Sequence, residues 1–132
     1  GWAVLCRLLG ADEDPNVRAE AANALASYGV ARSWPLLRDA FATDAAWLVR
    51  CSILSALAEQ PEIPLAWLLE LGAMAITDAD GTVRVSGAEV LGRLVREGDA
   101  QAVGDQARTL LRPLQQDGDH RVVAAALNGL QS

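Results

Sequence analysis

One pattern of polar and apolar positions occurs four times along the chain. Each copy opens with an Asp that stands five residues before a Val, and an Ala- and Leu-rich stretch follows. The opening residues are Asp12, Asp44, Asp78 and Asp117, and the Val residues are Val17, Val49, Val83 and Val122. The copies start 32, 34 and 39 residues apart, which is the range of repeats that each form one supersecondary unit. The pattern therefore predicts a repeat protein.

Within a copy, the apolar residues follow the period of a helix with one buried face. In the first copy they recur at Val17, Ala21, Ala24, Leu25 and Tyr28, a spacing that places them on one side of a helix. Asp14 is placed to cap this helix, Pro15 suits its first position, and Gly29 suits its end. A second helix over about residues 32–41 follows, so each copy predicts a pair of helices.

The pattern divides residues 1–132 into a single domain of stacked helical pairs. We expect half a repeat at 1–10, whole repeats at 11–42, 43–76 and 77–116, and half a repeat at 117–132. A helix over about residues 100–114 has Asp99 as its expected cap, and Pro113 should bend or end it because proline donates no backbone hydrogen bond. Neither end shows a polar cap, so we expect further repeats beyond this segment or packing of these ends on another surface.

The copies resemble the HEAT repeat, and most of all the short repeats of phycobilisome lyases, which residues 78–94 (DADGTVRVSGAEVLGRL) match along their length. The resemblance covers essentially the whole chain. The resemblance implies an all-α, right-handed α-α superhelix of the HEAT-like or armadillo type, with about seven helices here. It also implies that the second helix of each pair lines the concave surface. The repeated Asp and Arg residues then form a structural ladder between neighbouring repeats, made of Asp12, Arg18, Asp44, Arg50, Asp78, Arg84 and Asp117.

Two copies depart from the shared pattern. The second has Ala46 where the others have the capping Asp14, Asp80 or Asp119, so we expect its helix to start earlier, near Ala45, with Asp44 as the cap. The fourth has Val123 in place of the ladder arginine, and Arg121 stands two positions earlier, which puts its pairing between repeats in doubt.

Charge narrows the classes of partner. The chain carries 17 acidic and 11 basic residues, a net charge of −6, and every basic residue is Arg. A general nucleic-acid binder needs a basic patch, so we expect no nucleic acid as partner. The absence of Lys also excludes Schiff-base chemistry and a P-loop lysine. No apolar run is long enough for a membrane span, and Cys6 and Cys51 fit reduced core residues of a cytoplasmic protein.

Candidate catalytic and metal-binding groups find simpler explanations. Asp78 and Asp80 resemble part of a calcium loop, but Arg84 would stand at the seventh position of that loop, so capping explains them better. His120 is the one histidine, and its spacing to other residues forms no catalytic arrangement. We therefore expect no enzyme, no cofactor and no metal.

The four tryptophans are the strongest indication of a binding surface in the sequence. Trp2, Trp34 and Trp67 lie at or near the start of second helices, and Trp2 and Trp34 stand one repeat apart and should form a pair. Trp is a favoured anchor in protein interfaces, although these rings could also fill gaps in the core. Trp47, on a first helix, is expected in the core. The candidate partner-binding residues are Trp34, Trp67, Arg32, Arg38 and Glu70.

These observations predict a non-enzymatic scaffold that binds a protein partner on the concave face, with a partner surface that is neutral or basic. End-to-end self-association through the uncapped ends is a further expectation. The resemblance implies one alternative, a lyase-like role in bilin attachment or phycobiliprotein assembly.

Overall fold

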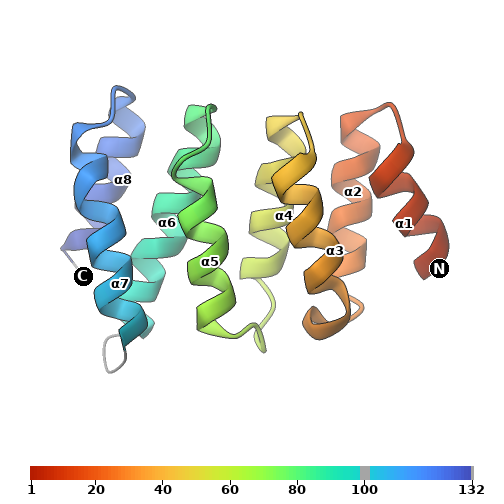
Figure 1. Ribbon diagram of the computed structural model, residues 1–132, viewed down its shortest axis with the longest axis horizontal. Coiled ribbons are helices and arrows are strands. Elements are labelled where there is room, and N and C mark those ends of the chain that lie inside the picture. The colour runs from red at the N-terminus through yellow and green to blue at the C-terminus, as the bar shows by residue number, and fades with distance from the viewer. Residues whose placement is uncertain (99–101, 132) are drawn as a thin grey trace. The chain divides into compact units, whose positions relative to one another are not determined.

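The computed structural model describes residues 1–98 and 102–131, and this part of the chain is all-α. It holds eight α-helices and a short 3-10 helix, against the expectation of about seven helices. They are α1 (Trp2–Ala11), α2 (Pro15–Ala26), α3 (Val30–Thr43), α4 (Trp47–Ala58), α5 (Leu65–Ala75), α6 (Gly81–Glu97), α7 (Ala102–Leu111), η1 (Arg112–Gln116) and α8 (His120–Leu130) (Figure 1). The chain forms two compact units, Gly1–Ile63 and Pro64–Ser132. The single domain and the right-handed superhelix stay predictions.

Unit 1 consists of two layers of helices. The second helices of the repeat pairs, α1 and α3, form one layer, and the first helices, α2 and α4, form the other (Figure 1). Small residues on α2 (Ala19, Ala22 and Ala26) are buried, which allows α2 and α4 to pack closely. Larger side chains complete the core, namely Leu9, Leu25, Leu37, Phe41, Val49, Ile53, Leu54 and Leu57. Burial of these apolar side chains is the main stabilising term of such a unit.

Unit 2 repeats this arrangement, with α5 and α7 as second helices and α6 and α8 as first helices (Figure 1). Glycines let these helices approach one another. A Cβ atom placed on Gly87 of α6 would lie 2.7 Å from the Cβ of Ala75 on α5, and one placed on Gly92 would lie 3.0 Å from the Cα of Gly129 on α8. Residues larger than Gly at these crossings would push the helices apart.

Three of the four first helices begin at the expected capping Asp. Asp14, Asp80 and Asp119 each accept a hydrogen bond from the backbone N–H two residues later. The expectation for the second copy is wrong, because α4 begins at Trp47 and its N-cap is Ala46. Ala46 has the same extended backbone as the capping Asp residues (φ −91°, ψ 121°), so the helix keeps its place in the repeat and loses only the side-chain cap.

The end of α7 follows the prediction for Pro113. The α-helix ends at Leu111, and the chain continues in the 3-10 helix η1, which contains the proline. The expected cap Asp99 and the expected start at Ala100 lie outside the described residues.

Some expectations about the core are wrong. Trp47 is 48% exposed, because it is the first residue of α4 and the buried face starts two residues later, at Val49. Tyr28 is 44% exposed, because α2 ends at Ala26 before its position. Cys6 and Cys51 are half-buried rather than core residues.

Candidate functional site

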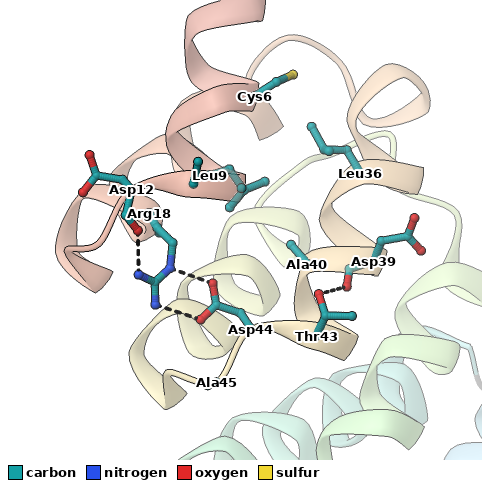
Figure 2. Close-up of a pocket in the computed structure, with 12 residues that line it drawn as sticks. Cys6, Leu9, Asp12, Arg18, Leu36, Asp39, Ala40, Thr43, Asp44 and Ala45 are labelled. Atoms are coloured by element: carbon teal, nitrogen blue, oxygen red, sulfur yellow. Dashed lines mark hydrogen bonds and ion pairs between the residues drawn. The ribbon is translucent and has the colours of Figure 1, made fainter.

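In unit 1, an open cleft separates the second helices α1 and α3. Its volume is about 440 Å³, and it lies toward the C-terminal ends of both helices. Cys6 and Leu9 line it from α1, and Leu36 and Ala40 line it from α3 (Figure 2). The α1–α3 cleft arises because α2 and α4 pack closely in the other layer, while α1 and α3 have no comparable contact.

The polar end of the α1–α3 cleft is built on Arg18. Its guanidinium donates to both carboxylate oxygens of Asp44, over 2.9 Å from Nε and 3.1 Å from Nη2 (Figure 2). Nη1 donates to the backbone oxygen of Asp12 over 2.9 Å. The Arg18 side chain therefore joins the opening turns of the first and second copies, and it is fully engaged by this part of the protein.

The ion pair changes the pKa of both partners. Desolvation acts to raise the pKa of Asp44, but the hydrogen bonds from Arg18 and from the Ala46 N–H outweigh it, and the net pKa is lowered. The pKa of Arg18 is raised, chiefly by its hydrogen bond to Asp44. Both groups are therefore charged at neutral pH, and the pair acts as a structural connection.

Unit 2 contains the same connection between the third and fourth copies. Arg84 donates to both carboxylate oxygens of Asp117, over 2.9 and 3.1 Å, and to the backbone oxygen of Asp78 over 2.9 Å. In the fourth copy, Arg121 pairs with Asp119 of its own copy at 2.8 Å and donates to Thr82 Oγ1 of the third copy. The shifted arginine thus makes a different connection between the same two copies.

Unit 2 also has an open groove between its second helices. The α5–α7 groove has a volume of about 520 Å³ and a mostly apolar lining. Its walls are Ala66, Leu69, Glu70 and Ala73 of α5, and Asp105, Gln106, Thr109 and Leu110 of α7. In both units, then, a groove opens between the second helices.

An aromatic and cationic cluster lies at the other end of α1. The rings of Trp2 and Tyr28 meet edge to face with their centroids 5.4 Å apart. The Arg32 guanidinium carbon lies 4.0 Å from the centroid of the Trp2 ring, which is the geometry of a cation–π interaction. Trp2 is therefore packed against Tyr28 and Arg32, contacts that the sequence did not indicate.

The five candidate residues fall in both units. Trp34, Arg32 and Arg38 belong to α3, and Trp67 and Glu70 belong to α5. Both tryptophans are half-buried, while Arg32, Arg38 and Glu70 are exposed. Glu70 lines the α5–α7 groove, whereas the other four residues are not among the lining of either groove.

Most groove residues were missed by the sequence reasoning. Leu69 and Asp105 line the α5–α7 groove although nothing in the repeat pattern marks them. The available signal was the second helices themselves, whose apolar residues extend beyond the one face that the core needs. That signal indicates a surface but names no single residue.

The described residues offer no catalytic arrangement of the kinds considered above. They hold no group of three or more His, Cys, Asp or Glu side chains placed to bind a metal. Asp78 and Asp80 each accept a backbone N–H, from Asp80 and Thr82 respectively. His120 is exposed at the start of α8. In the part of the chain that the structure describes, no helix has the length and apolar character of a membrane span.

The fold and the two grooves define a class, namely an all-α, HEAT-like stack of antiparallel helical pairs with an open surface on its second helices. Residues 2–58, which make up most of unit 1, match the family model of HEAT repeats. Repeats of this kind generally mediate protein–protein interactions. The comparisons with curated proteins and with solved structures found no match.

Proposed function

We propose that the chain is a non-enzymatic protein-binding module and that its second helices carry the binding surface. One observation carries this proposal, the occurrence of an open groove between the second helices in each unit. Grooves with apolar linings on rigid helices are suitable sites for partner side chains. The close packing of the first helices supports the same assignment, because that layer is occupied with holding the repeats together.

The charge of the molecule supports a partner surface that is neutral or basic. The chain has a net charge of −6, and acidic residues occur at both grooves, Asp39 at the α1–α3 cleft and Glu70 and Asp105 at the α5–α7 groove. Arg18, which also lines the α1–α3 cleft, is already paired with Asp44. The proposal therefore includes no nucleic acid among the partners.

The test is affinity capture from a lysate of the source cells with matched surface variants. Ala40→Arg blocks the α1–α3 cleft and Ala66→Arg blocks the α5–α7 groove, while Ala124→Arg places the same side chain on an exposed position of the first helix α8. We expect one and the same protein to be captured by the wild type and by Ala124→Arg, and to be lost from at least one groove variant.

Circular dichroism must first show that all three variants are folded. Equal capture of the same protein by all of them would overturn the proposal. Trp34→Ala and Trp67→Ala test the candidate residues in the same way, and unchanged affinity of both folded variants would remove the tryptophans from the binding surface.

An apolar groove between α1 and α2 supports self-association as part of the proposal. Leu5 and Leu8 of α1 and Val17 and Ala21 of α2 line this groove of about 340 Å³, and Val4 of α1 is 46% exposed. A second copy could cover this surface. Sedimentation velocity would show a species larger than the monomer that Leu8→Asp abolishes, and a monomer at every concentration would exclude it.

Bilin handling rests on the sequence resemblance alone, and no contact in the described residues favours it. Mixing the protein with a bilin and recording the visible spectrum is a direct test, in which an unchanged spectrum would end this alternative.

A further inference from the structure

We infer that the α5–α7 groove binds an amphipathic helix whose apolar stripe is flanked by basic side chains. This inference rests on the proposed protein-binding function and names the partner chemistry of one site. It is carried by the shape of the groove and by the residues at its edges.

The lining of the α5–α7 groove matches one helical stripe. On α5, the lining residues Ala66, Leu69, Glu70 and Ala73 stand at positions i, i+3, i+4 and i+7, so the groove follows the helix for two turns, a length of about 10 Å. Ala66 and Ala73 are small, and Leu69 and Leu110 supply apolar surface on the two walls. A partner helix laid along the groove presents side chains at the same spacing.

Other modes of peptide recognition fit this groove less well. The described residues contain no strand, so they offer no sheet edge to which an extended peptide could add. Polyproline segments dock in grooves lined by aromatic rings, and phosphorylated segments dock on clusters of arginine. The lining of the α5–α7 groove has neither an aromatic ring nor an arginine. Among these modes, a helix in the groove fits the lining best.

The edges of the groove select for positive charge. Glu70 on one wall and Asp105 on the other are both exposed, and they are the charged residues of the lining. Asp105 also pairs with Arg108 of its own helix at 3.3 Å, but the Asp105 side chain is 85% exposed in this pair. Exposed pairs of this kind are weak, so Asp105 can exchange its partner for a basic side chain of an incoming helix.

The test uses a synthetic peptide of about 18 residues, long enough to be partly helical alone. It carries a leucine stripe flanked by arginines, and a comparison peptide has glutamate in place of each arginine. Binding is measured by fluorescence polarisation on wild type, Ala66→Arg, the double variant Glu70→Gln/Asp105→Asn, and the matched control Ala124→Arg.

We expect the arginine peptide to bind wild type and Ala124→Arg equally, and at least about tenfold more tightly than the glutamate peptide does. Ala66→Arg should weaken binding about tenfold or more, and the double variant about three- to tenfold, with a smaller salt dependence. The inference is wrong if neither peptide binds, if both bind equally, or if Ala66→Arg leaves the affinity unchanged.

These failures can be separated from a failure of the proposed function. If the peptide does not bind but Ala40→Arg or Ala66→Arg still loses the captured protein, the helical partner is wrong and the protein-binding surface stands. If every variant captures the protein as the wild type does, the surface itself is wrong.

Discussion

At the scale of single residues, the Asp that opens each copy has two tasks. In all four copies its carboxylate accepts a hydrogen bond from the backbone N–H two residues later, from Asp14, Ala46, Asp80 and Asp119. In two described cases it also binds an arginine of the preceding copy, as Asp44 binds Arg18 and Asp117 binds Arg84. The first task fixes a turn within a copy, and the second connects two copies.

Asp44→Asn separates these two tasks. The amide oxygen can still accept from the Ala46 N–H, but the two-fold ionic contact with Arg18 is lost. We expect the melting temperature to fall by about 3–5 °C, since a charge-assisted pair with little exposure is removed. The control is Asp12→Asn, which keeps the corresponding turn and leaves the hydrogen bond from Arg18 to the Asp12 backbone oxygen in place. Differential scanning calorimetry should find a clearly smaller change for Asp12→Asn, and equal changes would contradict the assigned role of the pair.

The lowered carboxyl pKa values predict how stability depends on acid. The hydrogen bond from Arg121 lowers the pKa of Asp119 from 3.8 to about 2. The hydrogen bond from Arg84 likewise lowers the pKa of Asp117. Such groups bind fewer protons when folded, so their stabilisation is complete above the unfolded pKa and is lost as the pH falls toward the folded one. Urea unfolding should show a free energy of unfolding that falls from about pH 4 toward pH 2. Asp119→Asn should make this fall shallower, and an unchanged slope would refute the assignment.

At the scale of helices, the backbone of each copy keeps its place even where one side chain departs from the pattern. Ala46 occupies the N-cap position of α4 with the same φ and ψ as the aspartates elsewhere, although it makes no cap hydrogen bond. The expected earlier start was wrong because the packing of α4 against α2, and not one local side chain, fixes where the helix begins.

Ala46→Asp should therefore supply a missing cap without moving the helix. The new carboxylate can accept the N–H of Leu48, as Asp14 accepts that of Asn16. We expect the free energy of unfolding to rise by about 1 kcal/mol, measured by urea denaturation. Asp14→Ala is the reverse change and should cost a similar amount. A neutral or destabilising effect of Ala46→Asp would show that the α4 start does not accept a cap.

Close contact between helices of unit 2 depends on small residues. In Gly87→Ala, the new Cβ would meet Ala75 and the backbone nitrogen of Ile76, and backbone cannot swing aside. We expect a loss of about 1–3 kcal/mol, which exceeds the gain in helix propensity. Gly10→Ala in α1 has open space at the same atom and should stabilise by up to about 1 kcal/mol. Stabilisation by both substitutions in a chemical denaturation series would contradict the packing of α5 on α6.

The helices were more predictable than the site. Capping residues, Pro113 and the recurrent apolar face predict the position of nearly every helix, because these signals act within a few residues. Groove residues such as Leu69 and Asp105 depend on the distance between α5 and α7, which is set by residues elsewhere in the unit. Tyr28 is predicted to be buried because it continues the apolar spacing of α2, and Trp47 because it lies on a first helix. The structure places Trp47 at the first position of α4 and Tyr28 just beyond the end of α2, where the buried faces stop.

At the scale of the whole molecule, each of the two units has one layer of first helices and one layer of second helices. The first helices pack closely on small residues in each unit, and the second helices leave the α1–α3 cleft and the α5–α7 groove open. The chain carries an excess of acidic residues, with a net charge of −6. The central claim is that partners are bound by the second helices.

Site-specific photo-crosslinking in the source cells tests this claim most directly. A photoreactive residue is placed at Leu36 or Ala66 in the two grooves, and at Asn23 or Glu89, which are exposed on first helices. The claim predicts a crosslink to one and the same partner protein from a groove position and none from Asn23 or Glu89. Crosslinks to that partner from the first helices, with none from Leu36 or Ala66, would contradict it.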